Sequence, residues 1–367
     1  MLLLSKNSVA IVTGTRPSII KFSPLIREFE SRKIPFFLIH SGQHYSYNMD
    51  RIFYDQLNLK PPRLRACFQP SSYPGEQTAA MLRGIERILM EVRPKLVLVG
   101  GDANTNLAGA LAARKLDLIL GHVEAGLRSF DWRMPEEHNR IIIDHISDYL
   151  YVPSSEAKRQ VESESVHGEV FVVGNPIVEA VSENLKIASR KSKVMSLLSL
   201  RQDEYLVCTS HRKENVDDKN NLKSILNGLA RVSERTHLRA IFPVHPRTLK
   251  RILEFSLAVP DGVELINPLG YMDFLVLVSN SRLLLTDSGG AVEEACILKV
   301  PCVTIRDNIE WTETLRVGAN VVAGVDPENI LRKSLRMISR KRNWRVPFRK
   351  GAPKKIADHA LRLLQTS

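Results

Sequence analysis

The sequence of 367 residues lacks several features that would place it in a specialised class of protein. No apolar run approaches the ~20 residues that a helix needs to cross a bilayer, and the opening MLLLSKNS has too short an apolar core for a signal peptide. Four cysteines without a CxxC pair are too few for a disulfide framework in so long a chain. We therefore expect a globular cytoplasmic protein with reduced thiols and no membrane-spanning segment.

Common cofactor and metal motifs are also missing. The chain contains no GxGxxG dinucleotide fingerprint, no GxxxxGK[ST] phosphate-binding loop and no HExxH metal motif. His138 and His145 are seven residues apart and could share a helical face, but no third ligand stands at metal spacing. These absences disfavour a dinucleotide-dependent enzyme and an ATPase, and we expect neither a metal nor another cofactor.

The positive charge of the chain is concentrated in one segment. The net charge of +12 arises from 52 basic and 40 acidic residues, and residues 331–355 carry eleven lysines and arginines and no acid. This segment lacks the stacking aromatics that are interleaved with basic residues in nucleic-acid-binding motifs. We interpret it as a solvated helix and connector, and we expect no nucleic-acid or membrane partner.

The sequence does contain a regular alternation of apolar runs and amphipathic stretches. Strand-like runs such as SVAIVTG, KLVLVGGD and EVFVVGN alternate with helical patterns such as EQTAAMLRGIERILMEV, and the alternation starts again after GNPIVEAV. This pattern is typical of parallel sheets covered by helices. The sequence therefore predicts an α/β protein with two doubly wound units in tandem, joined near residues 174–176.

Polar residues directly follow the predicted strands in both halves. Ligands of such sheets bind beyond the carboxyl ends of the strands, so these positions are the candidates for chemistry. They are residues 14–16, Gln43, His44, Asp102, His122, Glu124, His211, Arg212, His245, residues 287–290, Arg306 and Asp307. The charge-rich stretch GHVEAGLRSFDWRMPEEHNR, which follows the apolar LDLIL, is either a solvated loop or a reaction site for an anionic substrate.

The stretch LLLTDSGGAVEEACIL predicts a strand, a tight glycine turn and a helix. The amides of Ser288, Gly289 and Gly290 would then project from a helix N-terminus, where the helix dipole and free donors favour a phosphate. Glu294 lies about one turn inside that helix, where a carboxylate suits the paired hydroxyls of a ribose. Together these residues are consistent with a nucleoside diphosphate site, although a glycine turn of this kind also starts many ordinary helices.

Two further positions could contribute to anion binding. VTGTRPSIIK predicts a second strand-turn-helix, in which Arg16 and Lys21 add positive charge near the helix start. His211 in CTSHRKEN stands at a predicted strand end, whereas His245 in PVHPR is also explained as a residue that holds its loop. A lone histidine is more often structural, so the interpretation of His211 depends on its position.

Ten segments in order resemble the non-hydrolysing UDP-N-acetylglucosamine 2-epimerases, particularly their archaeal branch. They are GTRPSIIKFSPLI, SGQHY, GDANTNLAGALAA, GHVEAGLRSFD, MPEEHNR, VGNPI, HRKENV, VHPRT, LTDSGGAVEEA and DNIEWTETLRVGAN. The resemblance implies two Rossmann-like domains of glycosyltransferase-B type that face each other across a cleft, and usually a homodimer. The implied limits are 1–172 for the domain with catalytic carboxylates, 173–349 for the UDP-binding domain and 350–367 for a helix that returns to the first domain.

The resemblance also implies roles for individual residues. Asp102, Glu124 and Glu136 match the catalytic carboxylates of the family, and His211 matches the histidine at the β-phosphate. The substrate-binding positions are Arg16, Lys21, Arg140, Phe274, Ser288, Gly289, Gly290 and Glu294. Gln43 and His44 match a loop at which a second nucleotide sugar can activate bacterial members. For Glu137 and Arg128 we predict structural ion pairs.

The chemistry of such a reaction explains why several carboxylates are needed. The C2 hydrogen of an N-acetylhexosamine is not next to a carbonyl, so direct deprotonation has no enolate to stabilise the carbanion. Anti elimination of UDP gives C1 oxocarbenium character, allows a carboxylate base to remove the C2 proton and yields 2-acetamidoglucal. Re-addition of UDP, with protonation of the opposite face, inverts C2 and converts UDP-GlcNAc to UDP-ManNAc.

Four alternatives remain at this point. The substrate could be a UDP-GlcNAc with a 3-acetamido group or a uronic acid. A hydrolysing epimerase would release ManNAc and UDP instead of UDP-ManNAc. A glycosyltransferase of the same fold would need an acceptor and would not need carboxylates around the sugar ring, and a nucleotide-sugar sensor would bind without turnover.

Overall fold

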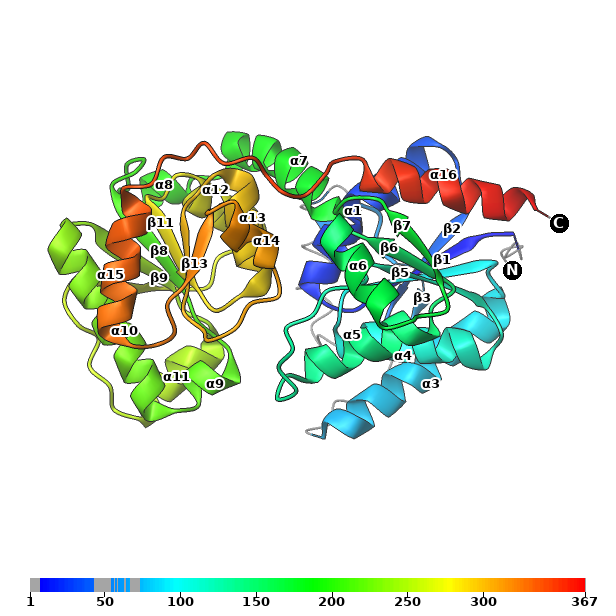
Figure 1. The fold of residues 1–367 in the computed structure, drawn as a ribbon, viewed down its shortest axis with the longest axis horizontal. Helices are drawn as coiled ribbons and strands as arrows, with labels where there is room; N and C mark the ends of the chain where they lie inside the picture. The colour runs from blue at the N-terminus through cyan, green and yellow to red at the C-terminus, as the bar shows by residue number, and fades with distance from the viewer. Residues whose placement is uncertain are drawn as a thin grey trace. The chain divides into compact units, whose positions relative to one another are not determined.

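The structure is a computed structural model that describes residues 7–42, 54, 55, 57, 59–62, 64–66 and 73–366. The chain divides into two compact units: unit 1 comprises residues 1–180 with 348–367, and unit 2 comprises residues 181–347 (Figure 1). The change from one unit to the other falls inside helix α7 (Pro176–Lys191). In the described ranges, no helix is both long and apolar enough to span a membrane.

Unit 1 is built on a parallel sheet with the strand order β3-β2-β1-β4-β5-β6-β7 among the described residues. Its strands are β1 (Val9–Thr13), β2 (Phe36–His40), β3 (Leu64–Arg65), β4 (Leu96–Gly100), β5 (Ile119–Val123), β6 (Tyr149–Val152) and β7 (Glu169–Val172). Its helices, besides the first part of α7, are α1 (Arg16–Ser31), α3 (Pro74–Val92), α4 (Asn104–Lys115), α5 (Pro135–Ile146), α6 (Ser155–Ser163) and α16 (Ala352–Gln365).

The central strands of unit 1 are buried on both faces, which explains their continuous apolar sequence. All five residues of β1, VAIVT, are buried, as expected of a parallel strand covered by helices on both sides. Helix α4 approaches this sheet closely because Gly109 has no side chain. A Cβ at Gly109 would lie 3.1 Å from Val12 Cγ1 and 3.2 Å from Val99 Cγ1.

Helix α16 closes unit 1 although it lies far along the chain (Figure 1). Ile356 and Ala360 are fully buried, and the hydroxyl of Tyr151 in β6 is 2.8 Å from His359 Nδ1. On the outer side, Arg32 pairs with Asp358 at 2.5 Å. Apolar burial and polar contacts thus fix this helix to unit 1.

Unit 2 is also built on a parallel sheet, with the strand order β10-β9-β8-β11-β12-β13. Its strands are β8 (Tyr205–Thr209), β9 (Arg239–Pro243), β10 (Val263–Ile266), β11 (Leu283–Thr286), β12 (Cys302–Thr304) and β13 (Asn320–Val322). Its helices, besides the end of α7, are α8 (Val194–Leu197), α9 (Lys213–Val216), α10 (Lys219–Thr236), α11 (Pro246–Glu254), α12 (Tyr271–Ser279), α13 (Gly289–Leu298), α14 (Thr312–Arg316) and α15 (Pro327–Ile338).

The strand orders confirm the prediction of two doubly wound α/β units and locate their ligand-binding edges. In unit 1 the chain winds outward from β1 in one direction and from β4 in the other, and in unit 2 the corresponding strands are β8 and β11. Ligands of doubly wound sheets bind beyond the carboxyl ends of the strands at such a switch point. Asp102 follows β4, and Asp287 follows β11, so both units place an aspartate at this point.

Candidate active site

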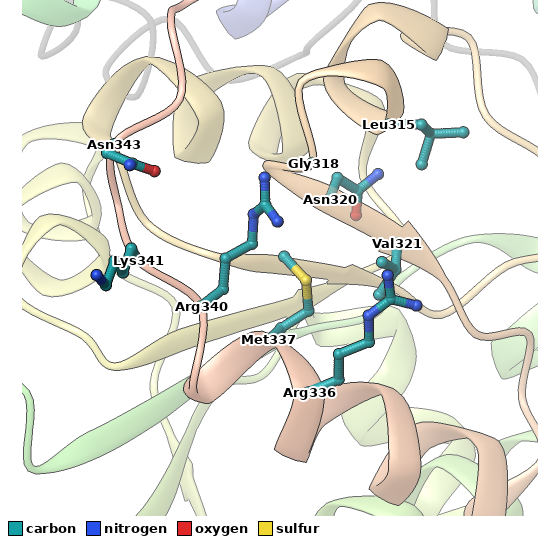
Figure 2. A pocket seen from close by; sticks show the side chains of 9 residues that line it. All are labelled: Leu315, Gly318, Asn320, Val321, Arg336, Met337, Arg340, Lys341 and Asn343. Atoms are coloured by element: carbon teal, nitrogen blue, oxygen red, sulfur yellow. The ribbon is translucent and has the colours of Figure 1, made fainter.

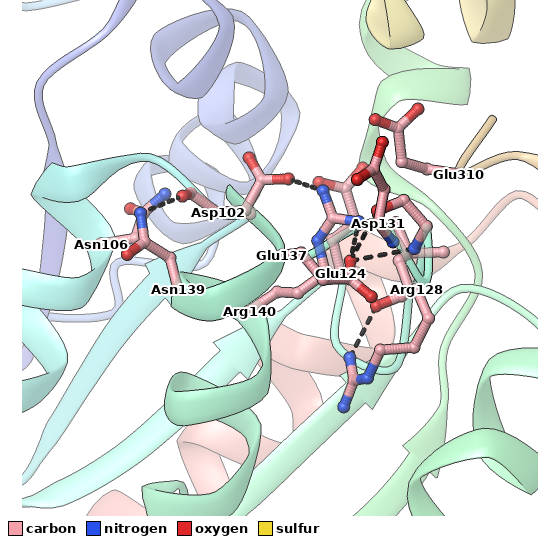
Figure 3. Close-up of polar contacts among 12 residues, drawn as sticks. Asp102, Asn106, Glu124, Arg128, Asp131, Glu137, Asn139, Arg140 and Glu310 are labelled. Atoms are coloured by element: carbon pink, nitrogen blue, oxygen red, sulfur yellow. Dashed lines mark hydrogen bonds and ion pairs between the residues drawn. The ribbon is translucent and has the colours of Figure 1, made fainter. Parts of the chain in front are cut away.

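Asp102 lies at the switch point of unit 1 and is held by residues of helix α5 (Figure 3). Arg140 donates from Nη2 to Asp102 Oδ2, and Asn139 donates from Nδ2 to the Asp102 carbonyl at 2.8 Å. The Asp102 side chain remains 38% exposed, whereas that of Arg140 is 5% exposed. A carboxylate in contact with a buried guanidinium but still open to solvent has a fixed position and can reach a ligand.

Glu124 follows the neighbouring strand β5 and adopts an unusual backbone conformation. Its φ of 71° lies in the left-handed region, which residues other than glycine rarely adopt. Lys21 of α1 forms an ion pair with Glu124 Oε2, and Asn175 Nδ2 lies 3.4 Å from Oε1. The strained backbone and both contacts direct this carboxylate to a defined place, which is typical of residues at functional sites.

The first turn of helix α5 contains two acidic residues, Glu136 and Glu137, that differ in burial. Glu137 is 1% exposed and accepts hydrogen bonds from the amides of Ser129 and Phe130, both at 2.9 Å, and from Arg140 Nη1 at 2.8 Å. Glu136 precedes it in the first helical turn and is only partly buried. The ion-pair prediction for Glu137 is therefore confirmed, while Glu136 is the more accessible carboxylate of the two.

A buried charge network around Asp144 was not predicted from the sequence. His122 and Asp144 are both fully buried, and His122 Nδ1 lies 2.7 Å from Asp144 Oδ1. Asp144 also pairs with Arg128 at 2.7 Å and accepts from the Gly126 amide at 3.1 Å. Arg128 in turn pairs with Glu164 at 2.5 Å, which confirms the predicted structural role of Arg128.

Both nitrogens of the His122 ring have a partner in this network. One ring nitrogen faces the Asp144 carboxylate, and the other lies 3.1 Å from the Gly101 carbonyl, which can only accept. Burial alone would raise the pKa of Asp144, but hydrogen bonding and charge from His122 and Arg128 lower it below its ordinary value. Through these two contacts His122 links the turn before Asp102 to helix α5.

The glycine turn of unit 2 presents amides at the start of α13 that have no hydrogen-bond acceptor among the described residues. Ser288 is the N-cap, and its own amide donates to Thr286 Oγ1 at 3.0 Å. Gly289 and Gly290 are the first two helical residues, so their amides have no partner within the helix. The predicted anion site therefore relies on the amides of these two glycines and on the helix dipole.

Asp287 organises the loop that carries His211. It is fully buried and accepts hydrogen bonds from Ser210 Oγ at 2.7 Å and from the amide of Arg212 at 3.0 Å. His211 Nδ1 lies 3.4 Å from Asp287 Oδ1, and its side chain is 40% exposed. Burial lowers the pKa of His211 from its ordinary value, and the charge of Asp287 opposes this effect only in part.

Other predicted substrate-binding residues of unit 2 surround the same helix. Glu294 lies on α13, near Tyr271 of α12. The burial of Tyr271 and the negative charge of Glu294 raise the pKa of the tyrosine well above its ordinary value. Phe274 is partly buried on α12. Sequence analysis did not assign Glu310, which is buried against Gly289 and lies 3.3 Å from Arg306.

The remaining predicted residues lie around the start of α1 or outside the described residues. Ser18 Oγ accepts from the amides of Gly14 and Thr15, at 3.3 and 3.2 Å, so these donors are already used. Arg16 begins α1, and Lys21 contacts Glu124. Gln43 and His44 lie outside the described residues. In the part of the chain that the structure describes, no group of three acidic, histidine or cysteine side chains is arranged to hold a metal.

Comparison with known proteins adds independent evidence to this geometry. The family model described as UDP-N-acetylglucosamine 2-epimerase matches residues 27–360. The chain belongs to this family. The UDP-N-acetylglucosamine 2-epimerase of Methanocaldococcus jannaschii is 46% identical over 97% of this chain and 98% of that protein, and that of Methanococcus maripaludis is 47% identical over 95% and 96%.

A solved structure supports the fold of this epimerase family member. The crystal structure of the Methanocaldococcus jannaschii UDP-GlcNAc 2-epimerase in complex with UDP-GlcNAc and UDP matches it with a TM-score of 0.90 and 46% identity. The match covers 97% of this chain and 99% of that one. The predicted family, and its fold of two Rossmann-like units of glycosyltransferase-B type, are thereby confirmed.

Proposed function

We propose that this protein catalyses the reversible C2 epimerisation of UDP-GlcNAc to UDP-ManNAc. The observation that carries the proposal is the placement of Asp102 and Glu124 beyond neighbouring strands, each with a fixed cationic partner, in a member of the epimerase family. Similarity to relatives named for this activity, over nearly the whole chain, supports the same substrate.

The reaction proceeds by anti elimination and re-addition. A carboxylate removes the C2 proton while the bond from C1 to the β-phosphate oxygen breaks, and the electron pair of the C2–H bond forms the C1–C2 double bond. UDP leaves with the electrons of the C1–O bond. Addition of UDP to C1, with delivery of a proton to the opposite face of C2, gives the epimer. No change of oxidation state is required.

The side chains of unit 1 supply the acid and base groups of this proposal. Asp102, Glu124 and Glu136 are the candidates, and two of them already contact a cation, Arg140 for Asp102 and Lys21 for Glu124. These partners hold the two carboxylates in fixed positions, as proton transfer at a defined carbon requires. Glu136, at the start of α5, is the candidate to deliver or receive the second proton.

The diphosphate in this proposal is bound by unit 2. The amides of Gly289 and Gly290 and the dipole of α13 would attract its charge, and Glu294, on the same helix, would contact the ribose. The lowered pKa of His211 keeps its ring neutral in the free protein near pH 7. An incoming diphosphate favours the imidazolium, which then stabilises the charge on the departing UDP.

Nuclear magnetic resonance of UDP-GlcNAc in deuterated buffer tests the proposal. We expect UDP-ManNAc to form with deuterium at C2, and deuterium to enter C2 of the remaining UDP-GlcNAc. Free ManNAc with UDP would instead identify a hydrolysing enzyme. Inertness toward UDP-GlcNAc would contradict the proposal and favour a glycosyltransferase, a sensor or an epimerase for a 3-acetamido or uronic-acid analogue.

We also propose the organisation in which this reaction takes place. Residues 1–172 would carry the acid and base chemistry, residues 173–349 would bind UDP, and residues 350–367 would complete the first domain. The nucleotide-sugar substrate and the similarity to the epimerases favour a cytoplasmic homodimer, and Gln43 and His44 are candidates for activation by a second UDP-GlcNAc. Light scattering during size-exclusion chromatography tests the dimer, and the substrate dependence of the initial rate tests the activation.

A further inference from the structure

Unit 2 contains a pocket of about 380 Å³ that is separate from the candidate active site. It is lined by Leu315, Gly318, Asn320, Val321, Arg336, Met337, Arg340, Lys341 and Asn343 (Figure 2). Asn320 is the first residue of β13, so the pocket lies where this strand begins. Because β11, β12 and β13 are parallel, this edge of the sheet is opposite to the one at which Asp287 and Gly289 follow β11.

The lining of this pocket carries positive charge without a compensating acid. Arg336, Arg340 and Lys341 line it, and no carboxylate does. Across the described ranges, none of these three side chains forms an ion pair, whereas their neighbour Arg342 pairs with Asp203 at 2.5 Å. Cations gathered around a concave surface raise the local concentration of anions.

Local geometry holds one of these cations in place. Arg340 Nη2 donates to the carbonyl of Val317 at 3.0 Å, and its guanidinium lies directly over Gly318. A Cβ at Gly318 would lie 2.3 Å from Nη2, so a larger residue there would displace the arginine. A guanidinium has five N–H donors, so Arg340 retains donors for a ligand.

The pocket also offers apolar surface and a buried amide. Figure 2 shows the side chains of Arg336 and Met337, at the end of α15, and of Arg340, which follows the helix, extending toward the strand that carries Asn320 and Val321. Met337 and Asn320 are each 1% exposed. Asn320 Oδ1 accepts from Thr304 at 3.0 Å, while Nδ2 has no partner among the described residues.

From these observations we infer that the pocket binds a small organic phosphate. Its volume falls within the ~300–1,000 Å³ typical of small-molecule sites. Arginine forks pair with phosphate oxygens through two hydrogen bonds, and the partly buried Leu315 and Val321 suit an apolar part of the ligand. This binding site gives the basic segment 331–355 a function beyond solvation.

Titration of the full-length protein with phenyl phosphate tests the inference, because this probe combines a dianion with a small apolar group. Isothermal calorimetry at low ionic strength, with excess UDP present to fill the proposed diphosphate site at α13, should show one site for the probe. The double variant Arg336→Gln/Lys341→Gln removes two charges, and neither side chain makes a hydrogen bond within the described residues. We expect it to weaken the affinity by about ten-fold or more, since charge-assisted contacts are lost.

A charge-matched control separates a built site from general attraction. Arg345→Gln/Lys350→Gln removes the same charge from the same basic segment, but neither residue lines the pocket. It should change the affinity by less than about two-fold. Equal losses in the two variants, unchanged binding in the pocket variant, or no binding to the wild type would each overturn the inference. Binding of heparin but not of phenyl phosphate would also overturn it and would indicate a surface for polyanions.

Discussion

At the scale of single residues, the two carboxylates of unit 1 are distinguished by how they are held. Arg140 and Asn139 fix Asp102 from one helix, and its carboxylate remains accessible. Glu124 is 7% exposed and depends on a left-handed backbone. Strain of this kind costs on the order of 1–3 kcal/mol and is retained where a side chain must point in one direction.

Replacement of Asp102 tests its chemical role. Asp102→Asn keeps the size of the side chain but removes the charge that a proton-transfer group needs, so we expect turnover to fall by about 10²–10⁴-fold. Exchange of the C2 proton in heavy water should be lost, while UDP affinity stays within about two-fold, since the diphosphate is assigned to unit 2.

The matched control is Asp131→Asn, which removes a charge from the same acidic segment. Asp131 binds Arg133 at 2.7 Å and is not assigned a part in proton transfer. It should leave exchange close to the wild-type rate. Normal exchange in Asp102→Asn would remove this residue from the proposed mechanism.

The buried pair of His122 and Asp144 predicts a pH-dependent stability. Because the pKa of Asp144 is lowered in the folded protein, its contribution is complete above the pKa of an unfolded aspartate, about 3.9, and is lost as the pH falls through the folded value. Asp144→Asn should lower the free energy of unfolding by about 3–5 kcal/mol at pH 7. The difference from the wild type should shrink below about pH 4.

Urea denaturation at a series of pH values from about 3 to about 8 measures the free energy of unfolding of both proteins. This range includes the pKa of an unfolded aspartate, about 3.9. Asp117→Asn serves as the control, because Asp117 is exposed and asparagine also tolerates its φ of 55°. A constant difference between wild type and Asp144→Asn across the whole pH range would contradict the assigned charge of Asp144.

The sequence was sufficient to predict which residues lie at the ends of strands, but not which side chains they contact. The apolar runs before Asp102 and Glu124 locate the ends of two strands, and sheet topology then makes those ends meet. The contact from Lys21 to Glu124 joins residues that are 103 positions apart, and no local pattern specifies it. The same holds for His122 and Asp144, whose side chains meet only because α5 packs beside β5.

At the scale of elements, helix starts decide which backbone donors a ligand can use. α1 and α13 both follow a strand through a short turn, and their sequences suggested two similar anion sites. The structure shows that Ser18 Oγ takes the amides of Gly14 and Thr15, whereas Gly289 and Gly290 begin α13 with free amides. A side chain three or four residues along the helix can thus use the donors that a sequence motif appears to offer a phosphate.

Gly290→Ala tests the assignment of α13 as the diphosphate site. A Cβ at Gly290 would meet no atom within 4 Å, so the free protein should tolerate alanine without loss of stability. If the diphosphate occupies that space, the methyl group should weaken UDP binding by about ten-fold, which corresponds to about 1.4 kcal/mol. Calorimetric titration with UDP measures the change.

Gly75→Ala provides the control, because it also adds a methyl group in the first turn of a helix and meets nothing within 4 Å. It lies on α3 of unit 1, to which no part of the diphosphate site is assigned, and should leave UDP affinity unchanged. Wild-type UDP affinity in Gly290→Ala would show that the diphosphate does not approach this turn.

At the scale of the whole molecule, alternation of strands and helices was sufficient to predict two doubly wound units. The limits of the units were harder to predict, because the change falls inside the continuous helix α7 and not at a break in secondary structure. The return of α16 to unit 1 was implied only by family resemblance, since its amphipathic pattern does not specify which surface it covers.

The packing of α16 predicts a stability effect confined to one unit. Ile356 is fully buried, so Ile356→Ala should destabilise unit 1 by about 2–5 kcal/mol through lost burial and a residual cavity. Hydrogen exchange followed by mass spectrometry should show lower protection in residues 73–180, with residues 181–347 unaffected. Lys354→Ala changes an exposed residue of the same helix and should preserve protection in both.

The discontinuity of unit 1 has a consequence for the order of folding during synthesis. The contact from Tyr151 to His359 spans 208 residues, and the whole of unit 2 lies between them in the chain. A ribosome produces chain from the N-terminus, so unit 2 is complete in sequence while unit 1 still lacks its closing helix. The apolar surface of unit 1 that α16 covers is then exposed to water until translation reaches that helix, so the N-terminal unit completes its folding last.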